Sequence, residues 1–153
     1  MTTPQRRPRR PRAESGEEVL RHLLEVAPAG LTRAALLERL GPTYSPSQAA
    51  SGTTWVKEVG ASREGRPFAW SRRNGSGFPD DVQTWVEYEL SQGRRAYTTL
   101  DRLLKSTVDP HLQQHPEDPI VRRLHERFSN AVREVGIALE ELKHPPPATP
   151  ASV

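Results

Sequence analysis

Four small or amide side chains lie on one face of a helix predicted over residues 45–59, and they are suited to hydrogen bonding rather than catalysis. They are Ser47, Gln48, Ser51 and Thr54. A Gln amide can bond the N6 and N7 atoms of adenine, a Ser hydroxyl can bond either type of base, and a Thr methyl can contact the thymine methyl. The pattern predicts base contacts in the major groove, with Lys57 nearer a phosphate. The alternative is a solvated polar face without function.

The helix that positions these residues has a well-defined predicted start. Ser45 is the expected N-cap, Pro46 suits the first turn, and Gln48 completes a capping box. Two apolar-periodic helices are predicted before it, one from Ser15 with Glu18 three residues on, and one after Thr32. We expect the inward face of the third helix to contain Ala49, Gly52 or Thr53, Val56 and Val59.

The segment after Gly60 predicts a β-hairpin. Residues 66–72 alternate apolar and polar, with Phe68 and Trp70 on one face, and the turn 74–77 follows. Three short helices followed by a hairpin are the order of a winged helix-turn-helix. This region has four basic residues that we expect to contact the DNA backbone or a minor groove: Arg63, Arg66, Arg72 and Arg73. An ordinary charged strand edge is the alternative.

Residues 1–14 and 144–153 are rich in Pro and poor in apolar side chains, so we expect both to be disordered. The first segment contains five Arg before any acidic residue, which predicts an arm that binds phosphates in a salt-dependent manner. A solubilising tail is the alternative. The arm's cations are Arg6, Arg7, Arg9, Arg10 and Arg12.

Residues 80–143 contain two long helical patterns joined by a connector, which predicts an antiparallel helical hairpin. Each apolar series has steps of three and four over about three heptads. We expect the hairpin to form a two-fold homodimer, although packing against the preceding domain is the alternative. The predicted dimer residues are Val86, Leu90, Tyr97, Leu100, Leu104, Leu124, Phe128 and Val135.

Catalysis, metal binding and membrane insertion are not indicated by the sequence. The 153 residues contain no Cys, which excludes disulfides and thiolate zinc sites. His111 and His115 lie four apart, but Pro110 and Pro116 flank them and no HExxH-type base is present. No run of 18 apolar residues exists. We expect a non-enzyme without cofactor, metal or small-molecule ligand, located in the cytoplasm with the nucleoid.

The segments GLTRAALLERL, SPSQAASGTTWVKEV, FAWSR, DDVQTWVEYEL and TTLDRLLKSTVDPHL resemble the RacP-like proteins of actinobacteria. That resemblance covers roughly residues 16–142. It implies an N-terminal winged helix, a C-terminal helical segment and a DNA-binding, regulatory role. The positions that it carries over are Ser47, Gln48, Ser51, Arg72 and Arg73.

The predicted fold is mostly α (α+β): a disordered arm at 1–14, a winged helix-turn-helix at 15–79, a helical hairpin at 80–143 and a disordered tail at 144–153. The predicted function is site-preferring binding of double-stranded DNA by a dimeric transcriptional regulator. One alternative is an architectural or partition-type DNA-binding protein with little sequence preference. A winged-helix adaptor that binds proteins instead of DNA is the other.

Overall fold

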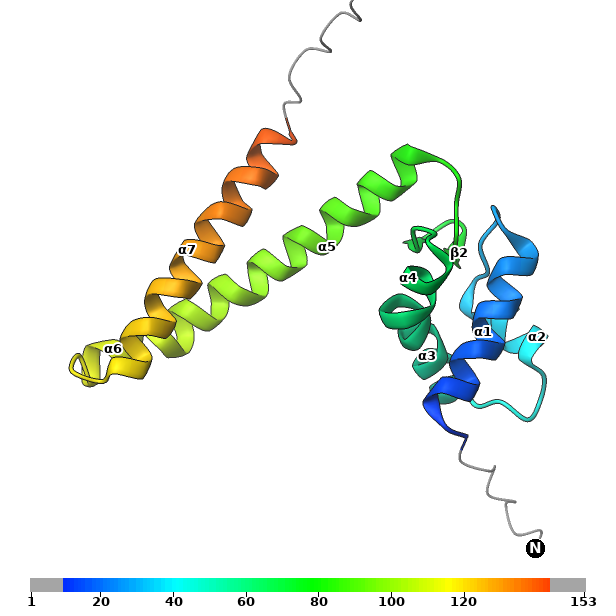
Figure 1. Cartoon of the computed structure of the whole chain (residues 1–153), viewed down its shortest axis with the longest axis horizontal. Helices are drawn as coiled ribbons and strands as arrows, with labels where there is room; N and C mark the ends of the chain where they lie inside the picture. The colour runs from blue at the N-terminus through cyan, green and yellow to red at the C-terminus, as the bar shows by residue number, and fades with distance from the viewer. Residues whose placement is uncertain (1–9, 144–153) are drawn as a thin grey trace, which may run out of the picture. The chain divides into compact units, whose positions relative to one another are not determined.

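The computed structural model describes residues 10–143, which are mostly helical with one two-stranded antiparallel sheet (Figure 1). The chain divides into two units, residues 1–88 and 89–153. The first unit contains α1 (Arg12–Val26), α2 (Arg33–Leu40), α3 (Pro46–Trp55), the π-helical turn η1 (Val56–Gly60), α4 (Ala61–Glu64), β1 (Ala69–Ser71) and β2 (Gly75–Gly77). Helix α5 (Val82–Leu103) begins in the first unit and continues into the second, where η2 (Leu104–Val108), α6 (Asp109–Gln114) and α7 (Pro119–Glu141) follow.

Helix α1 begins three residues earlier than expected, at Arg12, so the end of the predicted disordered arm is helical. Pro11 precedes the helix and its carbonyl accepts the Ser15 amide at 3.1 Å. Ser15 is therefore not an N-cap, and it is buried inside the first unit. The remaining arm cations Arg6, Arg7 and Arg9 and the tail 144–153 lie outside the described residues.

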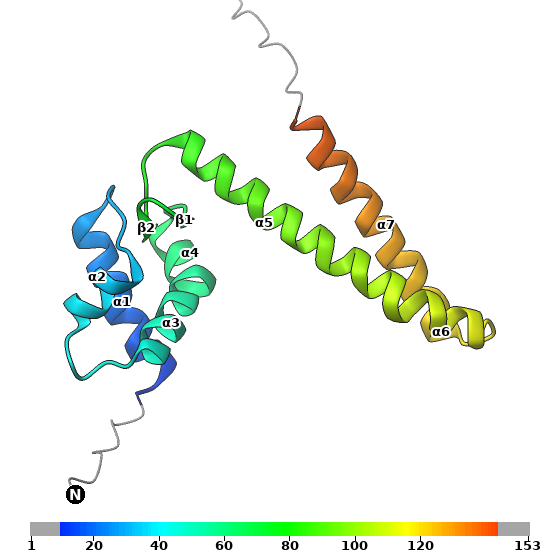
Figure 2. The same ribbon diagram turned by 180° about the vertical axis from the view of Figure 1, so that it is seen from behind.

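Helices α1 and α3 pack side by side, as Figures 1 and 2 show from opposite directions. Small residues make this approach possible. A Cβ atom placed on Gly52 would lie 2.6 Å from the Ser15 carbonyl oxygen and 2.7 Å from Val19 Cγ2. On α1, the Trp55 ring occupies the space where a Gly16 side chain would project. The distance between these helices is thus set by residues that have almost no side chain.

Helix α3, η1 and α4 form one continuous helical segment from Pro46 to Glu64, longer than the predicted 45–59. The π turn inserts an extra residue into the helical repeat and so changes which side chains face inward. Ala49, Gly52 and Val56 are buried as expected, but Gly60 takes the next inward position. Val59 is 43 % exposed, which corrects its predicted place in the core.

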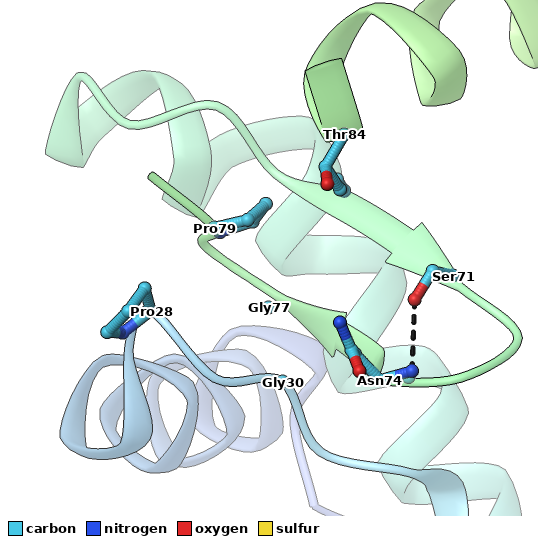
Figure 3. A pocket seen from close by; sticks show the side chains of 9 residues that line it. Pro28, Gly30, Ser71, Asn74, Gly77, Pro79 and Thr84 are labelled. Carbon is cyan, nitrogen blue, oxygen red and sulfur yellow. Dashed lines mark hydrogen bonds between the residues drawn. The ribbon is translucent and has the colours of Figure 1, made fainter. Parts of the chain in front are cut away.

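The β-hairpin is joined to the segment between α1 and α2. Strands β1 and β2 pair with Trp70 opposite Ser76, and Ser76 also exchanges two backbone hydrogen bonds with Leu31, of 2.8 and 2.9 Å. Figure 3 shows Gly30 beside the hairpin and the Asn74 amide donating to Ser71 Oγ at the turn. Gly75, with φ of 74°, approaches the Leu31 carbonyl closely. The extended segment around Leu31 thus pairs with β2 and holds the hairpin against the helices.

The core of the first unit is built from α1, α2, α3, η1 and the hairpin region. Phe78 is completely buried and its ring meets the Phe68 ring edge-on, with centroids 6.1 Å apart. The other buried apolar residues of this cluster are Val19, Leu20, Leu23, Leu31, Leu36, Leu40, Tyr44, Ala49 and Val56. These residues confirm the apolar stripes that were predicted on the first two helices.

The second unit has a much smaller core. Leu104, Val108 and Val121 are its buried apolar residues, with Phe128 packed against them. Gly136 lies against the Tyr97 ring, and Leu104 and Phe128 belong to the small core. These three residues of the predicted dimer set therefore contact residues of their own chain. Val86 and Leu124 are 37 % and 40 % exposed. The other predicted dimer residues are half-buried: Leu90, Leu100 and Val135.

Among residues 10–143, none of the helices combines the length and apolar character that a membrane span requires.

Candidate nucleic-acid interface

Hydrogen bonds in the first turn of α3 fix the residue at which this helix begins. The Ser45 hydroxyl accepts a hydrogen bond from the Gln48 backbone N–H at 3.1 Å, and Gln48 Oε1 accepts one from the Ser45 backbone N–H at 2.8 Å. This confirms the capping box and the Pro at the first turn. It also uses the Gln48 acceptor that base readout would need, so the structure gives Gln48 a positioning role at the cap.

The exposed side of α3 consists of small side chains. Ser47, Ala50 and Thr54 are exposed, and Ser51 is partly exposed. The Thr54 hydroxyl donates to the Ala50 carbonyl at 3.0 Å, so its methyl group is the part available to a partner. Small residues let another molecule approach the helix backbone closely. The polar character expected for this face is therefore carried by Ser47 and Ser51.

A groove of about 390 Å³ lies beside this face, between α2, α3 and the hairpin. Its rim has two cations, Arg33 at the start of α2 and Lys57 in η1, and one exposed aromatic ring, Trp70. Its floor contains Leu31, Leu36, Ala49, Ala50, Thr53, Thr54 and Ser76. Cations, a large ring and small side chains are thus brought together from α2, α3, η1 and β1.

Trp70 is 53 % exposed, whereas Phe68, which was predicted to share a face with it, packs against the core. Ala69, at 3 % exposure, is the residue of β1 that faces the core. Strand alternation then turns Trp70 outward. The alternating pattern of residues 66–72 does not by itself determine which phase of the strand faces the core.

The cations near α1 are held by carboxylates of the same chain. Arg10 pairs with Glu14 at 2.9 Å and lies 4.4 Å above the Tyr44 ring. Arg12 pairs with Glu58 at 2.5 Å. These two predicted phosphate contacts are therefore engaged within the protein.

Arg63 lies in α4 rather than in the hairpin, and its two terminal nitrogens contact the Glu17 carboxylate of α1 at 2.5 and 2.8 Å. This bidentate contact lowers the pKa of Glu17 and raises that of Arg63, the side-chain hydrogen bond being the main cause for both. Arg63 was predicted to bind the DNA backbone. In the structure its guanidinium links α4 to α1.

A second group of cations in the first unit has no carboxylate within 4.0 Å among residues 10–143. It consists of Arg33, Lys57, Arg66, Arg72 and Arg73. Lys57 Nζ lies 5.4 Å from the Phe68 ring centre, and Arg66 lies 5.9 Å above Phe78. Arg72 and Arg73 are exposed at the turn between β1 and β2. Their charges are available to an external anion.

Sequence reasoning missed two of the groove residues, Arg33 and Trp70. Arg33 directly follows the Thr32 cap, whose hydroxyl accepts the Ala35 amide at 3.2 Å, so it sits in the exposed first turn of α2. That position was a usable signal, because in a helix-turn-helix the helix that precedes the recognition helix crosses the DNA backbone, where a cation can contact a phosphate.

The two connector histidines belong to the second unit. His111 Nε2 lies 3.6 Å from Asp118 Oδ2, and His115 Nδ1 lies 3.6 Å from Glu117 Oε1. Asp118 also caps α7, accepting the Ile120 amide at 2.8 Å. Over the described part of the chain, no group of three or more His, Asp or Glu side chains is placed to hold a metal ion.

Comparison with family models, with curated proteins and with solved structures finds no match for this chain.

Proposed function

We propose that the first unit is a winged helix that binds double-stranded DNA. The order α1, extended Leu31, α2, α3, β1, β2 supports this fold, with Leu31 acting as the third strand of the small sheet. In such domains the helix following the turn enters the major groove and presents its N-terminal residues to base edges. Here that helix is α3, which starts with a complete capping box.

One observation carries the proposal: the first unit's cations are divided into two sets. Those beside α1, including Arg39 of α2, are paired with the protein's own carboxylates, whereas Arg33, Lys57, Arg66, Arg72 and Arg73 are not. Exposed cations without a paired carboxylate raise the positive potential of the surface and attract anions from solution. A surface with small residues, unpaired cations and an exposed ring suits a phosphate backbone flanking a groove.

In the proposed complex, Ser47, Ser51 and the Thr54 methyl contact base edges. Lys57 and Arg33 contact the phosphates that border the groove, and Arg72 and Arg73 reach the neighbouring backbone or minor groove. Gln48 maintains the start of the helix. The most concrete cellular role is that of a transcriptional regulator, and an architectural DNA-binding protein with little sequence preference is the version without base contacts.

The exposed Trp70 favours a second candidate, an adaptor that docks a protein segment in the same groove. Leu31, Leu36 and Ala49 give that groove an apolar floor, which a nucleic acid does not need. Aromatic anchors of this kind are common at protein interfaces. The two candidates use the same residues, so binding experiments decide between them.

Selection from a random pool of double-stranded DNA tests the proposal. The full chain is compared with Thr54→Ala, which removes the exposed methyl, and with Arg21→Ala as a control on α1. The regulator version predicts an enriched motif that changes at one position in Thr54→Ala and stays the same in the control. Binding without enrichment supports the architectural version. Absence of binding at low salt refutes DNA binding and leaves the adaptor.

A further inference from the structure

The second unit buries too little of its apolar surface. Helices α5 and α7 have 22 and 23 residues, yet α5 has no fully buried residue and α7 has only Val121. Large apolar side chains remain exposed on both helices: Leu103 at 40 %, Leu124 at 40 %, Ile137 at 47 % and Leu142 at 55 %. Two long amphipathic helices with a core of three buried residues are expected to cover this surface with another molecule.

Arginines surround the exposed apolar residues where α5 ends and α7 begins. One surface groove of about 580 Å³ contains Ala96, Leu100 and Leu103 beside Arg95. Another of about 400 Å³ contains Ile120 and Leu124 beside Arg123. Six Arg of these segments have no carboxylate within 4.0 Å among the described residues: Arg94, Arg95, Arg102, Arg122, Arg123 and Arg127.

Carboxylates surround the exposed apolar residues at the other ends of the same helices. On α7 and at its C-cap, Ile137 and Leu142 are accompanied by Glu134, Glu140 and Glu141. Glu134 pairs with Arg133 and Glu140 with Lys143, so carboxylates exceed cations here by one and Glu141 has no paired cation among the described residues. The first part of α5 shows the same combination, because its exposed Val82 and Val86 lie among acidic residues and no basic ones. Those acidic residues are Asp80, Asp81, Glu87 and Glu89. Apart from Ile137, the exposed apolar residues of each helix lie on one face and form an apolar stripe, and the balance of the charges beside it changes sign along the helix.

We propose that a second copy of this chain covers the open face of α5 and α7, with its helices antiparallel to those of the first. This arrangement places the arginine-rich segments of each copy against the carboxylate-rich segments of the other. A two-fold axis makes both contacts equivalent, as an isologous interface requires. A parallel arrangement would instead juxtapose arginine with arginine, which is unfavourable.

The apolar stripe and the matching carboxylates favour a second copy over a nucleic acid as the occupant. DNA would neutralise the arginines, but it would leave the exposed leucines and isoleucines uncovered. It would also be repelled by the acidic segments of the same helices. Because this inference uses residues of α5 and α7 alone, it does not depend on the DNA-binding proposal.

Charge reversal in the full chain tests both the dimer and its direction. One double variant combines Arg94→Glu with Arg95→Glu, and the other combines Glu140→Arg with Glu141→Arg. The four residues are exposed and lie outside the proposed DNA interface. Sedimentation velocity over a concentration series gives the mass, and circular dichroism checks folding. If either reversal unfolds the protein, Gln replaces the same residues and the measurement is repeated.

We expect the wild type to have twice the 17.2 kDa mass of one chain, with dimerisation weakened by raised salt. Each variant alone should dimerise about tenfold more weakly or worse, because attractive contacts become repulsive at both ends of the interface. An equimolar mixture of the two variants should form a heterodimer of restored affinity. In that heterodimer, every reversed segment meets a reversed partner.

Three results would overturn the proposal. The first is a wild-type mass of one chain at all concentrations. The second is a failure of the expected pairing between variants. Either the mixture dimerises no more tightly than each variant alone, or the arginine-reversed variant pairs more tightly with wild type than wild type does with itself. The tighter pairing with wild type would indicate a parallel dimer. The third is unchanged mass with lost DNA binding in the arginine-reversed variant, which would assign these arginines to nucleic acid.

Discussion

Replacing Gly52 by Ala tests whether the close crossing of α1 and α3 is as tight as the structure indicates. Helix propensity alone predicts stabilisation, by about 1 kcal/mol, because Gly52 lies inside a helix. The structure predicts the opposite sign. The added methyl would lie 2.6 Å from the Ser15 carbonyl oxygen and 2.7 Å from Val19 Cγ2. The carbonyl belongs to the backbone of α1, so the whole helix must move to relieve the contact.

Overpacking of a rigid core costs about 1–3 kcal/mol, and a backbone obstacle places Gly52→Ala near the upper end of this range. After subtracting the gain in helix propensity, we expect a net loss of about 2 kcal/mol in the free energy of unfolding. With a urea dependence of about 2 kcal/mol per molar, the unfolding midpoint falls by about 1 M. Tryptophan fluorescence is a suitable signal, because Trp55, Trp70 and Trp85 all lie in the first unit.

Gly60→Ala is the matched control, since it lies in the same continuous helical segment with φ of −60°. Its added methyl would meet Trp55 Cζ3 at 3.4 Å and the Leu20 methyls at 3.5 Å, which are ordinary contacts. We therefore expect Gly60→Ala to raise the midpoint, by about 0.5 M. If Gly52→Ala is as stable as wild type or more stable, the close crossing of α1 and α3 is wrong.

Three further predictions concern the cap, an ion pair and pH. Ser45→Ala should lower the free energy of unfolding by about 1 kcal/mol in urea titrations, whereas exposed Ser47→Ala should change it little. Arg63→Ala should leave affinity for DNA, measured by fluorescence anisotropy, within about twofold of wild type, because Arg63 is held by Glu17; a larger loss would return Arg63 to the interface. The pKa values of Glu17 and Glu18 are lowered, chiefly by hydrogen bonds from Arg63 and Arg21, so their stabilisation is complete above pH 4.5 and is lost as pH falls through the lowered values. Urea midpoints in acid should therefore fall less in Arg63→Ala, and an equal fall would contradict this.

Local signals in the sequence were sufficient to predict the caps of the second and third helices. Thr32 and Ser45 act through neighbours three residues away, so their hydrogen bonds follow from the pattern alone. The same logic was wrong for Ser15, whose spacing to Glu18 also matches a capping box. Tertiary packing explains the difference, because Ser15 is needed as a small residue where α3 crosses α1.

The candidate site could be predicted only in part. The polar face of α3 and the cations of the hairpin turn follow from residue types. The separation of paired from unpaired arginines does not, since Arg63 and Glu17 are 46 residues apart and meet only in the folded chain. The phase of β1 likewise depends on the folded chain, in which Ala69 rather than Trp70 faces the core. The charge reversal along α5 and α7 was visible in the sequence, but its meaning depends on which residues stay exposed.

The salt dependence of binding to double-stranded DNA tests the central claim most directly. The measurement compares wild type, a variant with Arg72→Ala and Arg73→Ala, and the control Arg21→Ala, each over a range of salt concentrations. Every phosphate contact contributes about 0.9 to the slope of log affinity against log salt. The account predicts that the slope falls by about 2 in the double variant and stays unchanged in Arg21→Ala. Equal slopes in all three proteins would contradict the assignment of the unpaired cations to DNA.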